Sequence, residues 1–166
     1  MLFRSMQRES EDSVLRTVCD LCSKRLPNKY GEGIVDKIQV ISPTKKGSAG
    51  TYTLNINLQG ILNPPSNRKK EYKYKDKIFR VGDKVMQIKN NYELEWEEGE
   101  KSGVGVFNGD IGYVEDISFE DETLSVVFDK RRVTYDFFIL DELELAYAIT
   151  VHKSQGSGAT RSLVKS

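Results

Sequence analysis

Two short polar segments hold the residues best suited to bind an anion. The first, residues 44–50 (Thr-Lys-Lys-Gly-Ser-Ala-Gly), follows the apolar run 38–41 and offers Lys45, Lys46 and free backbone amides around Gly47. Cations and amides of this kind form anion sites where a loop leads into a helix. The second segment concentrates hydrogen-bond donors before Gly156, namely Thr150, His152, Lys153, Ser154 and Gln155. Together the two segments indicate a protein that binds a polyanion.

A third segment, residues 66–77, is strongly basic and contains two aromatic side chains. Its cations are Arg68, Lys69, Lys70, Lys73, Lys75 and Lys77. Tyr72 and Tyr74 are interleaved with these cations, a pattern typical of sites where cations follow a phosphate backbone and aromatic rings stack on bases. The alternative is a solvated surface loop, which charge runs commonly form. The sequence alone leaves both interpretations open.

Other kinds of chemistry are excluded by what the sequence lacks. No Gly-x-x-x-x-Gly-Lys-Ser/Thr loop occurs, so the phosphate cradle of an independent nucleoside triphosphatase is missing. No group of carboxylates is spaced to hold a metal ion. Cys19 and Cys22 have no second cysteine pair to complete a zinc site and fall within a helical pattern. We therefore expect both cysteines to pack as small apolar side chains.

Composition limits the class of protein. The chain has 166 residues, with 25 basic and 25 acidic side chains and a formal net charge of zero. Binding of nucleic acid through overall basicity is thus excluded, although a local basic patch is not. The length suits one full-size domain or two small ones. No apolar run approaches the roughly 18 residues of a membrane span, so we expect a cytoplasmic protein without membrane contact.

The first third of the sequence predicts an α/β unit. A helical pattern runs from Ser10 to Leu26, with Pro27 and Gly31 expected to end it, and a short buried strand is predicted at residues 38–41. Residues 51–62 are ambiguous, because apolar residues alternate as in a strand but also recur at helical spacing. The local pattern alone favours a strand.

The middle of the sequence predicts an inserted β-barrel. Five short strands are expected at residues 78–81, 84–88, 111–114, 124–128 and 132–135, separated by turns rich in Gly, Asp and Asn. Short strands with tight turns suggest a small barrel of the SH3-like type. Residues 93–105, rich in Glu and Gly, are predicted to form an exposed loop. An α/β pattern resumes after residue 143, so the barrel is expected to interrupt an α/β domain.

Four ordered blocks of this sequence resemble the RecD-type helicase family, which includes the alpha subunit of exodeoxyribonuclease V and its stand-alone relatives. The blocks cover most of residues 3–157. They are residues 38–43 with Lys46-Gly47 and the run 54–64, then Gly82-Asp83-Lys84-Val85-Met86-Gln87 with Asn90-Asn91-Tyr92, then Phe107-Asn108-Gly109-Asp110-Ile111-Gly112, and finally Ala146 to Ser157 with its His-Lys-Ser-Gln-Gly core.

The resemblance implies part of a RecA-like motor domain with an inserted small SH3-like barrel. Residues 1–65 and 143–157 would belong to the second motor domain, and residues 66–142 to the barrel with its basic loop. The resemblance also makes residues 51–62 a helix, stabilised by burial of Leu54, Leu58 and Ile61. ATP and magnesium are implied for the full-length parent, and single-stranded DNA and the other exodeoxyribonuclease V subunits are implied as partners.

Site residues follow from the resemblance in two groups. The nucleotide cleft would be lined by Lys45, Lys46, Gly47, Gln155 and Gly156. DNA would be contacted by Thr150, His152 and Lys153, and by the basic run through Lys69, Lys70, Lys73 and Lys75. A structural alternative for His152 is that it caps the carbonyls of a helix spanning residues 146–155, in which Tyr147, Ala148 and Val151 face the core.

Two departures from the family limit what this chain is expected to do. The first motor domain, with its phosphate loop and magnesium-binding acids, is absent, so we expect no ATP hydrolysis by the chain alone. Residues 158–166 lack the acid and aromatic residue with which the family continues, and we expect them to be a divergent tail of foreign origin. The alternative function is a non-enzymatic module, built on the barrel, that binds nucleic acid or another protein.

Overall fold

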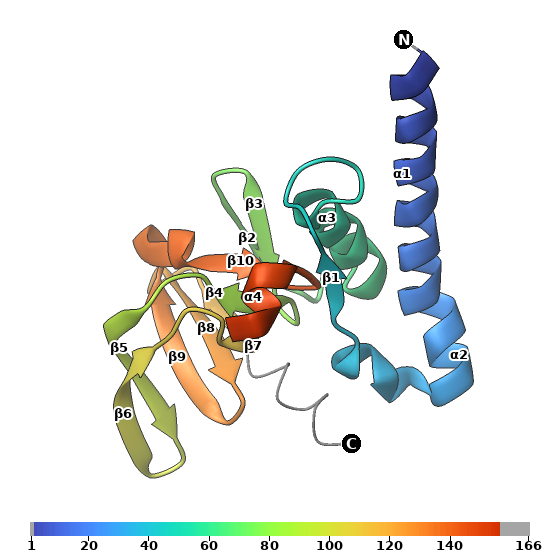
Figure 1. The fold of residues 1–166 in the computed structure, drawn as a ribbon. Helices are drawn as coiled ribbons and strands as arrows, with labels where there is room; N and C mark the ends of the chain where they lie inside the picture. The colour runs from blue at the N-terminus through green and yellow to red at the C-terminus, as the bar shows by residue number, and fades with distance from the viewer. Residues whose placement is uncertain (1, 157–166) are drawn as a thin grey trace. The chain divides into compact units, whose positions relative to one another are not determined.

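The computed structural model describes residues 2–156, which fall into two compact units (Figure 1). Unit 1 comprises Met1–Pro64 and Tyr147–His152, and unit 2 comprises Pro65–Ala146 and Lys153–Ser166. The expected tail, residues 158–166, lies outside the described residues. None of the helices within residues 2–156 is long and apolar enough to cross a membrane.

Unit 1 begins with a long helical segment. It consists of α1 (Leu2–Asp20), a π-helical stretch (Leu21–Arg25) and α2 (Leu26–Tyr30), followed by a 3-10 helix (Glu32–Lys37). The prediction that Pro27 ends the helix is wrong, because a proline is tolerated in the first turn of α2. Gly31, with φ of 91°, ends the segment as expected. Cys22 is buried and Cys19 half-buried, and burial raises the pKa of both thiols.

The rest of unit 1 is a parallel strand pair and a helix. β1 (Val40–Ser42) pairs with β11 (Ala148–Thr150), and α3 (Thr51–Leu62) lies between them in the chain. The Asn55 amide fixes α3 to β11: its Nδ2 donates to the Ala148 carbonyl at 2.9 Å and its Oδ1 accepts from the Ala148 amide at 2.8 Å. These side-chain bonds satisfy the strand backbone as a neighbouring strand would.

The strand preferred locally for residues 51–62 is wrong, and the helix implied by the resemblance is present. Its buried face holds Leu54, Asn55, Leu58 and Gln59, whereas Ile56 is 65% exposed. The expected burial of Ile61 is also wrong, since its side chain is 45% exposed. At about 100° per residue, Ile61 lies at the margin of a face centred near Asn55 and Leu58.

Unit 2 contains a seven-stranded antiparallel sheet with the order β10-β4-β7-β8-β9-β5-β6. The five strands expected from the sequence are present in the unit, four of them in this sheet and one, β3, in a separate hairpin with β2. A 3-10 helix (Phe137–Glu142) completes the unit. The strands are β2 (Glu71–Tyr74), β3 (Lys77–Arg80), β4 (Lys84–Gln87), β5 (Asn91–Glu98), β6 (Lys101–Val106), β7 (Ile111–Ser118), β8 (Thr123–Phe128), β9 (Arg131–Asp136) and β10 (Leu143–Leu145).

The expected loop at residues 93–105 is wrong, because most of it forms the hairpin β5–β6. Leu94 and Trp96 pack against the core of the unit, while Glu93, Glu95 and Glu97, which alternate with them, are exposed, so the segment has the period of two that a strand requires. Gly103 lies opposite Trp96, and a Cβ there would approach the indole to 2.3 Å. Glycine at this position makes room for the indole.

The core of unit 2 is filled by alternate residues of its strands. On β8, Leu124, Val126 and Phe128 are buried, and on β9 Val133 and Tyr135 are buried. Phe79, Val85, Val106, Val114, Ile117, Leu140 and Leu143 belong to the same cluster. Burial on this scale is the main source of stability for the barrel, and it leaves the outward residues of each strand available for other roles.

The helix considered for residues 146–155 is shorter than expected. Tyr147 and Ala148 are buried, but Ala148 to Thr150 form strand β11, and α4 spans Val151–Gly156. Val151, expected on the core face, is 40% exposed. The parallel partner β1 explains the difference, because pairing with its backbone favours extended geometry over helix at these residues.

Candidate nucleic-acid interface

The register of β1 and β11 brings two of the predicted segments to one edge of the strand pair. Ser42 lies opposite Thr150 at the carboxyl ends of both strands. The loop with Lys45, Lys46 and Gly47 leaves β1 at this edge, and α4 with His152 leaves β11 at the same edge. In open α/β sheets, ligands bind outside the carboxyl ends of parallel strands.

The loop after β1 is tied together by its own hydrogen bonds. Ser42 Oγ donates to the carbonyls of Thr44 at 3.1 Å and Ala49 at 2.7 Å. The amides of Thr51 and Tyr52, in the first turn of α3, donate to the Thr44 and Lys45 carbonyls at 3.0 and 3.2 Å. Within residues 44–50 the expectation of free amides is wrong for Lys46 and Gly50, whose amides donate to Thr44 Oγ1 at 3.3 Å and to the Gly47 carbonyl at 3.1 Å.

What the loop still offers a ligand is its cationic side chains. Lys45, Lys46 and Gly47 are exposed, and Gly47 has a φ of 88°. Gly50 is buried, and a Cβ there would lie 2.4 Å from the Lys46 carbonyl oxygen. The closed loop therefore fixes the backbone from which both lysines project, so an anion would be bound by their charge.

The segment after β11 divides its side chains between different roles. Thr150 is 8% exposed, whereas His152 is exposed in the first turn of α4. That position contradicts the alternative in which His152 caps the carboxyl end of a helix. Lys153 Nζ donates to the Ile88 carbonyl at 3.4 Å and to Asn108 Oδ1. Gln155 and Gly156 lie within α4.

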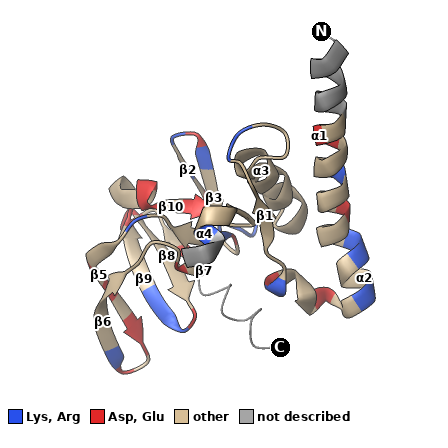
Figure 2. Cartoon of the chain, in the orientation of Figure 1, with Lys and Arg blue, Asp and Glu red and all other residues tan. Residues whose placement is uncertain are grey.

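The basic run forms a hairpin, which we call the basic hairpin and define as residues 68–80. It contains β2 and β3 and holds seven basic and two acidic residues (Figure 2). Tyr72 stacks on Phe137 with ring centroids 3.7 Å apart, and Tyr74 also packs against the core. The hypothesis that these tyrosines stack on bases is therefore wrong, as is the interpretation as a loop.

The lysines of the basic hairpin have different surroundings. Lys69, Lys73 and Lys75 are exposed, and Lys75 Nζ lies 5.1 Å from the centre of the Tyr74 ring. Lys70 Nζ donates to Asp116 Oδ1 at 2.9 Å, and this bond lowers the pKa of the Asp116 carboxyl. The structure thus brings the four predicted lysines together on one hairpin, with the charge of Lys70 already matched by a carboxylate.

A buried polar network in unit 2 was missed by the sequence analysis. Tyr135 Oη donates to Gln87 Oε1 at 2.7 Å, and Gln87 Nε2 donates to Glu142 Oε2 at 2.8 Å. Asn91 Nδ2 also donates to Glu142 Oε2, at 3.0 Å. Burial, with the nearby Glu142 charge, raises the pKa of the Tyr135 hydroxyl. A polar Gln87 at the end of an apolar strand is the signal that could have revealed the network.

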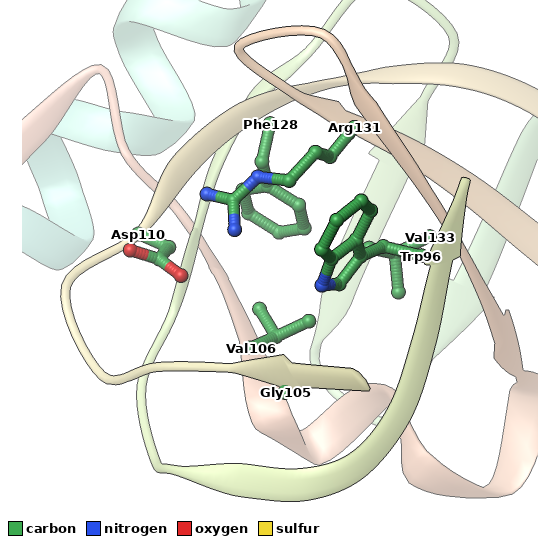
Figure 3. Close-up of a pocket in the computed structure, with 7 residues that line it drawn as sticks. All are labelled: Trp96, Gly105, Val106, Asp110, Phe128, Arg131 and Val133. Atoms are coloured by element: carbon green, nitrogen blue, oxygen red, sulfur yellow. The ribbon is translucent and has the colours of Figure 1, made fainter. Parts of the chain in front are cut away.

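A shallow hollow in the barrel is too small to hold a nucleotide. It is lined by residues that include Trp96, Phe128 and Arg131 (Figure 3), and it encloses no space that would hold even a water molecule. The Arg131 guanidinium lies 5.5 Å from the Trp96 ring. Small-molecule sites usually enclose about 300–1,000 Å³. Within residues 2–156, no group of three His, Cys, Asp or Glu side chains is placed to hold a metal ion.

Comparison with known proteins identifies relatives of the barrel and its flanks. Residues 54–128 match the family described as the ATP-dependent RecD-like DNA helicase SH3 domain. The chain is 36% identical over 120 residues to the ATP-dependent RecD2 DNA helicase of Deinococcus radiodurans, a match that covers 72% of this chain. It is 33% identical over 144 residues to the uncharacterized protein MJ1519 of Methanocaldococcus jannaschii, covering 74% of this chain.

These relatives are much longer than the chain. It spans 15% of the length of the first and 12% of the length of the second. Among solved structures, that of Bacteroides Pif1 bound to ssDNA aligns with a TM-score of 0.40 and 20% identity. The alignment covers 72% of this chain and 32% of that one.

Proposed function

We propose, from the match of residues 54–128 to the SH3 domain family of ATP-dependent RecD-like DNA helicases, that the chain is the part of such a helicase in which a second RecA-like motor domain carries the barrel. The described residues would then supply contacts to single-stranded DNA and one wall of an ATP cleft. The helicase activity itself would need the segments that the longer relatives have in addition.

The observation that carries this proposal is the register of β1 and β11. Ser42 faces Thr150, so the lysine loop and α4 start from the same edge of a parallel pair. Between these strands the chain passes through almost the whole of unit 2. A motor domain interrupted by a barrel would have this arrangement, because the interrupted strands must pair across the insertion.

The cleft residues fit a triphosphate in part. Exposed Lys45 and Lys46 match its charge. The amides of Thr51 and Tyr52 are already bonded, so they cannot bind the phosphates of ATP. This suits a segment that forms one wall of an ATP cleft whose main phosphate-binding residues belong to another part of the helicase. ATP would supply the free energy for movement along DNA. The residues of this chain would hold its phosphates and orient them.

The DNA contacts would come from two places. His152 is exposed in α4, and Lys69, Lys73 and Lys75 are exposed on the basic hairpin. Long-range attraction between lysines and phosphates does not depend on base sequence, which suits an enzyme that moves along any strand. Lys153 and Lys70 are engaged within unit 2, so we assign them a smaller share of the binding.

The test uses the full-length protein that contains this segment. Replacing Lys45 and Lys46 with alanine is expected to raise the KM for ATP at least roughly tenfold, because two phosphate-facing charges are removed. Replacing Lys37, an exposed lysine before β1, is the matched control and should leave the KM unchanged. An unchanged KM in the double variant would contradict the placement of Lys45 and Lys46 in an ATP cleft. An equal rise in KM in the Lys37 variant would contradict it too, because the effect would then come from general charge.

A further inference from the structure

Two exposed aromatic side chains of unit 2 have no part in the core. Tyr92 is 68% exposed and Phe107 is 43% exposed. Their ring centroids are 5.8 Å apart and their planes meet at 69°, so they form an edge-to-face pair. Because apolar rings gain little by facing water, an exposed pair held in one place is a candidate contact surface.

The pair is held by the two segments that carry it, residues 88–92 and 107–110. Asn90 Oδ1 accepts from the Asn108 amide at 2.9 Å, and the Gln87 carbonyl accepts from the Gly109 amide at 2.8 Å. Asp110 Oδ2 accepts from the Phe107 amide at 2.9 Å. These bonds fix the backbone from which both rings project before any ligand arrives, which lowers the entropic cost of binding.

Polar side chains accompany the aromatic pair on the two segments that carry it. Asn90 and Asn108 are exposed, and Lys89, whose side chain is 60% exposed, has its Nζ 3.5 Å from Glu142 Oε1. Lys153, from the His-Lys-Ser-Gln-Gly block, donates to Asn108. The segment predicted to contact DNA is therefore joined by a hydrogen bond to the turn that carries Phe107.

We propose that Tyr92 and Phe107 form a stacking site for one or two bases of a single nucleic-acid strand. This inference rests on the proposed function, which supplies the strand. An apolar protein segment is less suited, because it would remove water from the exposed side-chain nitrogens of Asn90 and Asn108 without supplying an acceptor for them. The edges of bases supply such partners. Stacking on Tyr92 also places an uncharged base, and not a phosphate, next to Glu93.

The experiment compares two probes on the 166-residue chain. One is an oligothymidine of about fifteen nucleotides, and the other is an abasic strand of the same length, which keeps the phosphates but has no bases. The chain is expected to bind oligothymidine more tightly. In the double variant Tyr92→Ala, Phe107→Ala, affinity for oligothymidine should fall roughly 5- to 150-fold, while affinity for the abasic strand stays unchanged.

Two control variants separate stacking from other effects. Phe138→Ala removes an aromatic side chain that is 77% exposed elsewhere in unit 2, and it should keep the preference for bases. The double variant Tyr92→Phe, Phe107→Tyr keeps both rings and should also keep it. If the alanine variant retains the preference, the stacking site is wrong although DNA binding stands. If the unaltered chain binds neither probe, the proposed DNA contacts fail as well.

Discussion

The basic hairpin and the hairpin β5–β6 are built alike and charged oppositely. We call residues 91–106 the acidic hairpin, since they hold five acidic residues and one basic residue. Each hairpin packs aromatic side chains against the core, Tyr72 and Tyr74 in one and Trp96 in the other. In each, alternate residues are exposed and charged, with Lys73 on β2 and Glu95 on β5.

The two hairpins show that the fold requires apolar inward residues but does not determine the charge of the outward ones. Inward aromatic residues are needed by both hairpins, because burial of apolar area stabilises a two-stranded element that is marginal alone. The sign of the outward charge is not set by packing, because those side chains face solvent. The basic hairpin is therefore suited to a phosphate backbone. The glutamates of the acidic hairpin would repel one, so a strand bound at Tyr92 would be held there by its bases and not by its phosphates.

The largest expected effects come from the inward aromatic residues. Tyr72→Ala and Trp96→Ala should each lower the free energy of unfolding by about 2–4 kcal/mol, because each leaves a gap in the core. Urea unfolding followed by circular dichroism measures the change. The outward variants Lys73→Ala and Glu95→Ala should stay within about 0.5 kcal/mol of the unaltered chain. If Lys73→Ala and Glu95→Ala destabilised the chain as much as the aromatic variants, the inward and outward residues would not differ in their contribution to stability.

The acidic hairpin differs from the basic one in being anchored by the buried network at Asn91. Tyr135→Phe removes the hydroxyl that donates to Gln87 and leaves a buried acceptor without this partner. The expected cost is about 1–3 kcal/mol of unfolding free energy. Tyr92→Phe removes the hydroxyl that accepts a long, exposed hydrogen bond from Asn90 Nδ2, and it should change the free energy of unfolding by less than about 0.5 kcal/mol. Similar values for the two variants in urea unfolding would contradict the network.

The smallest expected effect concerns the ion pair of the basic hairpin. The hydrogen bond from Lys70 lowers the pKa of Asp116, so the folded carboxyl binds its proton less tightly than the unfolded one. The resulting stability is present above the unfolded pKa and disappears as the pH falls through the folded pKa. Lys70→Ala should raise the Asp116 pKa toward its ordinary value in an NMR titration. An unchanged pKa would show that the pair does not persist in solution.

Much of the fold could be predicted from patterns of single elements. The five barrel strands and the helical pattern before Gly31 follow from local periodicity and turn residues. Residues 51–62 could not be decided locally, because Tyr52 and Ile56 imitate a buried strand face although both are exposed on α3. What distinguishes helix from strand there is the pairing of Asn55 with Ala148 of β11, 93 residues away.

Less of the candidate site could be predicted. The grouping of Lys45 with His152 in one site stays a prediction, and the sequence could not show that the amides of Thr51 and Tyr52 are already bonded. The sequence left open whether Tyr72 and Tyr74 stack on bases, because interleaved aromatic residues look the same whether they face a ligand or a core. The exposed pair Tyr92 and Phe107 lies in two motifs distant in sequence, so only the structure joins them.

The measurement that tests the central claim most directly is the salt dependence of binding to oligothymidine by the 166-residue chain. Replacing Lys69, Lys73 and Lys75 with alanine should weaken binding and flatten the slope of log K against log salt by about 0.7 for each phosphate that these lysines neutralise. Replacing Glu93, Glu95 and Glu97 with glutamine on the acidic hairpin is the matched control and should not flatten it. A slope unchanged by the lysine replacements would contradict the assignment of DNA binding to the basic hairpin.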